Sequence, residues 1–86
     1  MNRQEKEQLG KEKAIKDIAL IQKWNCMKEA TGFRVIGNPS GGKYATERKI
    51  SILNGKTKVG EVKCGYSSIE DEAYFTEIKK FFNQKF

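Results

Sequence analysis

Glu61 and Lys63 stand two residues apart in the stretch from Val59 to Gly65, which has the pattern of a β-strand. Side chains at this spacing project from the same face of a sheet, so a carboxylate lies next to an ammonium group. Such a pair is either a surface ion pair, which contributes little stability, or part of a site in which carboxylates hold Mg²⁺ and a lysine orients a water molecule.

A second carboxylate, Glu47, opens the strand that precedes this one. If the two strands form a hairpin, we expect Glu47, Glu61 and Lys63 to converge at one end of the sheet. Two neighbouring carboxylates bind a hard divalent cation, which polarises a phosphate and lowers the pKa of a bound water. These three residues are therefore the candidate catalytic group, with Glu47 and Glu61 as Mg²⁺ ligands; ordinary cross-strand charge pairs are the alternative.

The composition limits the chemistry that is open to the chain. Its 86 residues include 17 Lys and Arg against 11 Asp and Glu, a net charge of +6, and no His. The lack of His excludes Ser-His catalysis and His-based metal sites, and the positive charge favours partners that carry phosphate. Cys26 and Cys64 are too few for a thiolate metal site and are expected to be reduced and packed. No apolar run is long enough to span a membrane and the amino terminus is polar, so a soluble cytoplasmic protein is expected.

The first half of the chain predicts a charged arm followed by a helix. Residues 1–12 are almost all charged or amide-bearing and are expected to bury nothing, which leaves one domain at residues 13–86. Apolar residues at three- and four-residue spacing predict a helix from about residue 11 to Glu29, with Gly32 just beyond its end.

The second half predicts three strands and a second helix. The strands are expected at residues 33–36, 46–53 and 59–66, and Ser67-Ser68 is expected to cap the helix that follows. A set of aromatic residues is expected to lie in the core, with a base-stacking platform as the alternative and burial in a partner subunit as a further alternative for Phe86. These residues are Trp24, Tyr74, Phe75, Phe81, Phe82 and Phe86. The predicted fold is α+β, with the order helix, strand, strand, strand, helix and both helices on one face of a three-stranded antiparallel sheet.

The register of the predicted hairpin decides which side chains meet. The dipeptide Asn54-Gly55 is a strong hairpin signal. A two-residue turn places Ile50 opposite Val59, whereas a three-residue turn places Ile50 opposite Val62. The sequence leaves both registers open.

Four basic residues near the loop and the hairpin are candidates for contacts to nucleic-acid phosphates. Lys43 ends the glycine-rich loop at residues 37–43, which has the pattern G-x-x-x-x-G-K but lacks the Ser or Thr that holds Mg²⁺ in a phosphate-binding loop. Arg48, Lys56 and Lys58 lie along the hairpin. DNA is the expected partner before RNA.

The order of these motifs resembles the PD-(D/E)xK nuclease superfamily, in particular its virus-type replication-repair nucleases and archaeal Holliday-junction resolvases. The resemblance implies a Mg²⁺-dependent DNA endonuclease in which Glu61-Val62-Lys63 is the E-x-K motif and Glu47 takes the other acidic position. Thr46-Glu47 replaces the Pro-Asp pair of the family pattern, and no residues remain for its fourth strand. Because resolvases of this type act in pairs, a homodimer is the expected assembly of a catalytic form.

The same order of elements also resembles the double-stranded-RNA-binding domain, which is complete at this length. That family places two lysines at the start of its last helix, whereas Ser68-Ile69 is followed here by Glu70-Asp71-Glu72. The alternatives to the nuclease are therefore a non-catalytic nucleic-acid-binding module of this kind and a small inhibitor or adaptor that docks on a protein.

Overall fold

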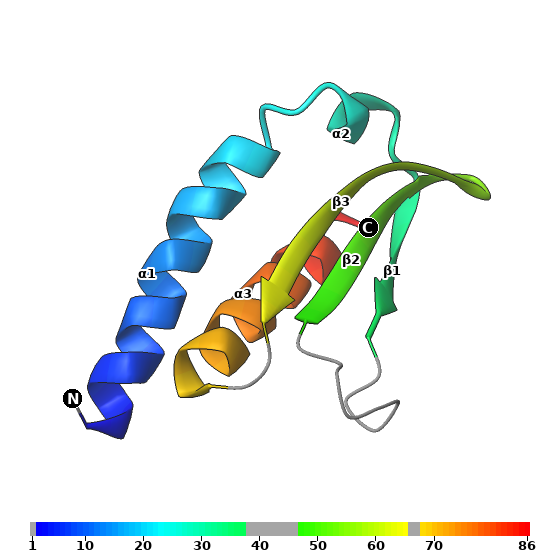
Figure 1. Cartoon of the computed structure of the whole chain (residues 1–86). Coiled ribbons are helices and arrows are strands. Elements are labelled where there is room, and N and C mark those ends of the chain that lie inside the picture. The colour runs from blue at the N-terminus through cyan, green and yellow to red at the C-terminus, as the bar shows by residue number, and fades with distance from the viewer. Residues whose placement is uncertain (1, 38–46, 66–67) are drawn as a thin grey trace.

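The computed structural model describes residues 2–37, 47–65 and 68–86. Its elements in chain order are α1 (Arg3–Ile21), α2 (Cys26–Glu29), β1 (Gly32–Ile36), β2 (Glu47–Asn54), β3 (Thr57–Gly65) and α3 (Ile69–Lys85). The three strands form an open antiparallel sheet in the order β1-β2-β3. The predicted α+β fold is confirmed, and Figure 1 shows α3 passing behind the strands with α1 alongside it, beyond β3.

The first helix begins and ends earlier than predicted. Asn2 caps its start, because the side-chain oxygen of Asn2 accepts a hydrogen bond of 2.9 Å from the backbone N–H of Glu5. α1 ends at Ile21, and the predicted continuation to Glu29 is instead a turn followed by the short helix α2.

The expectation that the first twelve residues bury nothing is wrong, because Gly10 lies fully inside the contact between α1 and α3. A Cβ atom at Gly10 would lie 2.3 Å from the backbone oxygen of Glu70 and 2.9 Å from Cβ of Ala73. The absence of a side chain at this position therefore permits the close approach of the two helices. The amino-terminal segment is part of the folded unit.

A single core lies between the sheet and the two long helices. Ser68 caps α3 as predicted, since its hydroxyl accepts a hydrogen bond of 3.1 Å from the N–H of Asp71. Burying a large apolar side chain stabilises a fold by about 1.5–3 kcal/mol. The buried apolar residues are Ile50, Ile52, Val62 and Cys64 from the sheet, Tyr74, Phe75, Ile78 and Phe82 from α3, Ala14 and Ile21 from α1, and Met27 from α2.

The hairpin between β2 and β3 combines a tight turn with a bulge. The two-residue turn is Gly55-Lys56, where Gly55 has a φ of +63°, and Gly at the first turn position is typical of a type II′ turn. Val59 then has no partner in the β2 register, so the pairing shifts by one residue. Ile50 lies opposite Val62, which is one of the two predicted registers. The expected three-residue turn is absent; a two-residue turn and the bulge at Val59 together give the same pairing.

This register gives the sheet two different faces. One face carries Ile50, Ile52, Val62 and Cys64 into the core. The other face, which we call the open face, is covered by no described helix (Figure 1). Its side chains come from alternate positions of the three strands: Arg34, Ile36, Glu47, Lys49, Ser51, Leu53, Lys58, Glu61 and Lys63.

Candidate functional site

Two lysines lie directly opposite each other on the open face. Lys49 of β2 pairs with Lys63 of β3 in the antiparallel ladder. The Cβ atoms of such partners are about 4.5–5.5 Å apart, and like charges in this position destabilise a sheet. Arg34 lies on β1 opposite Ser51, two ladder positions from the lysine pair, whose own neighbour on β1 is Ile36. Among the described residues, the open face carries four basic side chains, Arg34, Lys49, Lys58 and Lys63, against two acidic ones, Glu47 and Glu61.

Glu61 is the carboxylate that these lysines surround. Lys58 Nζ donates a hydrogen bond of 2.7 Å to Glu61 Oε2, and Lys63 Nζ lies 3.9 Å from Glu61 Oε1. The hydrogen bond from Lys58, with the charges of Lys63 and Lys49 nearby, lowers the pKa of Glu61 below its ordinary value of 4.5. Glu61 is thus ionised at neutral pH, and the groups next to it are ammonium groups.

The structure does not bring Glu47 to Glu61. Glu47 pairs with Gly65, whereas Glu61 pairs with Ser51, four residues further along β2. At about 3.3 Å per residue, this offset separates the two carboxylates by roughly 13 Å along the strand. Ligands of Mg²⁺ or Ca²⁺ lie only about 2.0–2.6 Å from the ion.

One cation therefore cannot be shared by these two residues, and the expected pair of Mg²⁺ ligands does not fit this geometry. Among the residues that the structure describes, no cluster of three or more Asp, Glu or Cys side chains is arranged to hold a metal ion. Of the candidate catalytic group, only Glu61 and Lys63 lie together.

Ser51 occupies the middle of the open face, between Arg34 on β1 and Glu61 on β3. It is only 1% exposed, and its Oγ has no hydrogen-bond partner in the described part of the chain. Leaving a buried polar group unpaired costs about 1–3 kcal/mol. The hydroxyl is therefore an unpaired donor that lies beneath the neighbouring side chains of the open face.

Sequence reasoning missed Arg34, Lys49 and Ser51. Their signal was the alternation of Lys49 and Ser51 with Ile50 and Ile52, which assigns the two polar residues to one face and the two isoleucines to the other. Arg34 joins that face through the register of β1 with β2.

The four predicted phosphate contacts fall in different places. Arg48 projects from the core side of the sheet, where its guanidinium donates a 2.5 Å hydrogen bond to Glu72 and lies 4.5 Å from the centre of the Phe75 ring. Arg48 therefore joins β2 to α3 and is not on the open face. Lys58 is on the open face, Lys56 is exposed in the hairpin turn, and Lys43 lies outside the described residues.

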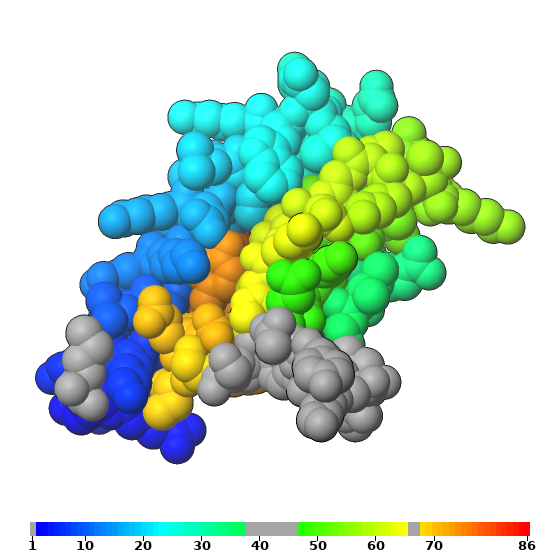
Figure 2. Space-filling model, in the orientation of Figure 1, coloured from blue at the N-terminus to red at the C-terminus, as the bar shows by residue number. Residues whose placement is uncertain are grey.

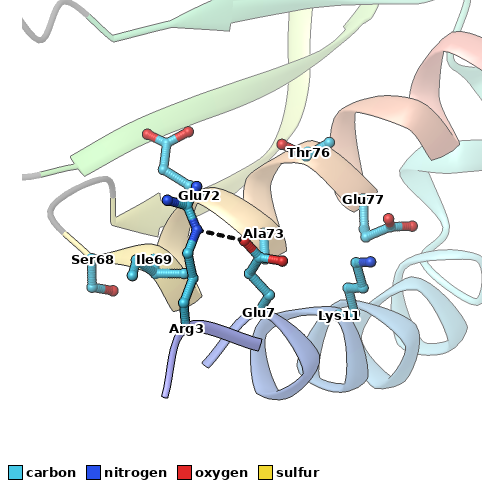
Figure 3. Close-up of a pocket in the computed structure, with 9 residues that line it drawn as sticks. All are labelled: Arg3, Glu7, Lys11, Ser68, Ile69, Glu72, Ala73, Thr76 and Glu77. Atoms are coloured by element: carbon cyan, nitrogen blue, oxygen red, sulfur yellow. Dashed lines mark hydrogen bonds and ion pairs between the residues drawn. The ribbon is translucent and has the colours of Figure 1, made fainter. Parts of the chain in front are cut away.

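The end of the molecule where α3 begins is acidic. A hollow of about 460 Å³ lies there between α1 and α3, and Figure 3 shows the ion pair of 3.0 Å between Arg3 and Glu7 on its wall. The first turn of α3 carries Glu70, Asp71 and Glu72. The charged residues of the hollow are Arg3, Lys11, Glu7, Glu72 and Glu77. This excess of carboxylates repels phosphate, in contrast to the lysine-bearing helix start of double-stranded-RNA-binding domains.

The two cysteines do not form a disulfide. Both are free thiols, Cys64 is buried and Cys26 half-buried. Burial raises the pKa of Cys64 to about 11, so the thiol stays protonated at neutral pH.

No protein-family model matches the chain, and neither a curated protein nor a solved structure matches it. Among the described residues, no helix is long and apolar enough to cross a membrane. The fold and the site define an α+β domain with a cationic open sheet face, and the function has to be argued from that face.

Proposed function

We propose that the protein binds the sugar-phosphate backbone of a nucleic acid with the open face of its sheet, and that it does so without cutting the strand. The observation that carries the proposal is the placement of Lys49 opposite Lys63, with Arg34 in the adjoining strand. A phosphate bound across the two lysines relieves their repulsion and accepts charge-assisted hydrogen bonds from them.

Double-stranded DNA is the favoured substrate class. The proposed contacts lie on three adjacent strands, Arg34 on β1, Lys49 on β2 and Lys63 on β3, and duplex DNA presents one phosphate charge per about 1.7 Å of its axis to such a face. The major groove of A-form RNA is too narrow for protein elements of this size. The open face carries no aromatic side chain among its described residues, so it offers no stacking platform for unpaired bases.

The number of cations that can contact phosphate sets the expected affinity. Lys58 is hydrogen-bonded to Glu61, whereas Lys63 lies 3.9 Å from the same carboxylate and is held more loosely, so Arg34, Lys49 and Lys63 are the main phosphate contacts. Three contacts correspond to a slope of about −3 in a plot of log binding constant against log salt concentration. We therefore expect weak, sequence-independent binding that fades steeply as salt is raised.

Binding without cleavage follows from the separation of the carboxylates. Metal-dependent hydrolysis of a phosphodiester requires a cation held next to the scissile phosphate. Glu47 and Glu61 lie too far apart in the ladder to hold one ion together. Glu61 instead serves to hold Lys58 and Lys63 in position.

The proposal is tested by fluorescence anisotropy of a short labelled duplex between about 50 and 200 mM salt. The double variant Lys49→Gln, Lys63→Gln should bind more weakly and lower the salt slope by about two units. Lys79→Gln, Lys80→Gln is the matched control, since it removes the same charge from exposed positions on α3. Equal losses in the two double variants would show that net charge, and not the open face, drives binding.

The absence of cleavage is tested in parallel with labelled duplex and branched DNA in Mg²⁺ or Mn²⁺. We expect the DNA to remain intact over hours at saturating protein. Metal-dependent cutting that disappears in Glu61→Gln would overturn this part of the proposal and support the nuclease that the E-x-K motif resembles.

A further inference from the structure

Glu61 lies among the basic side chains of the open face. Lys63 and Glu61 follow each other along β3 on this face, and Lys58 comes next, beyond the bulge. Figure 2 looks onto the open face and shows the yellow-green and yellow surface of β3 at the front, covered by no described helix. A phosphate that reaches the lysines of β3 therefore also meets the carboxylate between them.

The two lysines that flank Glu61 both contact it. Lys58 Nζ donates a hydrogen bond of 2.7 Å to Glu61 Oε2, and Lys63 Nζ lies 3.9 Å from Glu61 Oε1, so each carboxylate oxygen faces one ammonium group. A carboxylate and a phosphate accept the same charge-assisted hydrogen bonds from lysine. Glu61 thus occupies donors that a phosphate oxygen would otherwise bind.

These contacts lie where they can be exchanged. The side chains of Lys58 and Lys63 are 52% and 56% exposed, whereas that of Glu61 is 29% exposed. Both lysines are therefore more accessible from solvent than the carboxylate that they contact. Because exposed ion pairs contribute little stability, the fold does not depend on keeping Lys58 with Glu61.

We propose that Glu61 is an internal competitor of phosphate on the open face, which keeps Lys58 from the nucleic acid and weakens the contact of Lys63. The inference rests on the proposed nucleic-acid binding and concerns the regulation of its strength. With the charge of Glu61 in place, Arg34, Lys49 and Lys63 carry the contact. Without that charge, Lys58 becomes a fourth phosphate contact.

Glu47 offers a matched comparison on the same face. It is an exposed carboxylate at the far end of β2, and it forms no ion pair with the described residues. Neutralising either Glu47 or Glu61 removes one negative charge that repels phosphate. Only the change at Glu61 also releases a lysine.

The test is fluorescence anisotropy of a short labelled duplex with the wild-type chain, Glu61→Gln and Glu47→Gln between about 50 and 200 mM salt. Glu61→Gln should bind about tenfold more tightly at the lowest salt and steepen the slope of log binding constant against log salt from about −3 to about −4. Glu47→Gln should bind at most about threefold more tightly, with the slope unchanged, because it only reduces a screened repulsion. Equal gains and equal slopes in the two variants would overturn the proposal.

Lys58→Gln shows whether the released lysine causes the gain. In the Glu61→Gln background it should return the slope to about −3 and remove most of the added affinity. In the wild-type background it should leave the slope unchanged, because Lys58 is hydrogen-bonded to Glu61 there. A gain in Glu61→Gln that survives the loss of Lys58 would contradict the proposal.

Failure of the proposed nucleic-acid binding gives a different result. If duplex binding by the wild-type chain is absent, or does not respond to Lys49→Gln, Lys63→Gln, the open face is not the DNA site and both proposals fail. If that double variant lowers the slope as expected while Glu61→Gln behaves like Glu47→Gln, only the competitor role of Glu61 is wrong.

Discussion

Lys49 and Lys63 face each other across the β2-β3 ladder, on the side of the sheet that no described helix covers. The ladder places no carboxylate between them, and the nearest acidic side chain, Glu61, is hydrogen-bonded to Lys58. Two like charges opposite each other cost stability, and a phosphate bound between them, as proposed, would offset that cost. The proposed function therefore makes predictions about stability as well as binding.

Removing one of the two opposed charges should stabilise the fold. We expect Lys49→Gln to raise the free energy of unfolding by about 0.2–1 kcal/mol at low salt, because a like-charge cross-strand pair disappears. The gain should shrink as added salt screens the charges. Urea denaturation at low and high salt measures both effects. A loss of stability that does not depend on salt would mean that Lys49 contributes to folding through its packing instead.

Two serines should respond to alanine substitution in opposite ways. Ser51→Ala removes a buried hydroxyl that has no described partner, so stability should stay the same or rise by up to about 1 kcal/mol. Ser68→Ala removes the cap of α3 and should cost about 1 kcal/mol. Thermal unfolding of both variants makes the comparison. A large loss of stability in Ser51→Ala would show that its hydroxyl is already satisfied in the folded protein.

Two glycines test whether the amino-terminal segment belongs to the domain. Gly10→Ala should destabilise by about 1–3 kcal/mol, because the new Cβ meets the backbone of α3. Gly32→Ala is the control, since a Cβ there has no other atom within 4 Å. Guanidinium titrations give both values. If Gly10→Ala were harmless, residues 3–12 would not pack on α3 as described.

The thiol of Cys64 should make the fold sensitive to alkali. Burial raises its pKa from 9.0 to about 11, so the folded protein holds this proton over a range where the unfolded chain has released it. The contribution is intact below pH 9 and declines as the pH rises from about 9 toward 11. Cys64→Ala should flatten this part of the stability curve. Thiol reagents at pH 8 should modify Cys26 before Cys64, and faster reaction of Cys64 would contradict its burial.

The sequence predicted the kinds of element well because their signals are local. Helical spacing, the Asn54-Gly55 hairpin signal and the Ser68 cap each act over a few residues. The structure has the helices, the hairpin and the cap, but the hairpin turns at Gly55-Lys56, one residue later than the dipeptide. The start of α1 at Arg3 was predicted about eight residues too late, because a run of charged residues without apolar periodicity is typical of a disordered terminus. Nothing in the sequence shows that Gly10 lies where two helices approach closely.

The candidate site depended on long-range register, which local signals do not fix. The bulge at Val59 shifts the pairing of β3 and places Glu61 opposite Ser51, far from Glu47. The E-x-K spacing still predicted that Glu61 and Lys63 share a face. The partner of Lys63 across the ladder, Lys49, was overlooked because its role appears only once the two strands are aligned.

The most direct measurement is the map of amide shifts when a short DNA duplex is added to the ¹⁵N-labelled protein at low salt. The account predicts that the largest shifts cluster on the open face, at Arg34, Lys49, Ser51 and Lys63, and that they disappear in the variant Lys49→Gln, Lys63→Gln. Shifts that cluster on α1 or α3 with the open face unchanged, or no response to DNA at all, would contradict it.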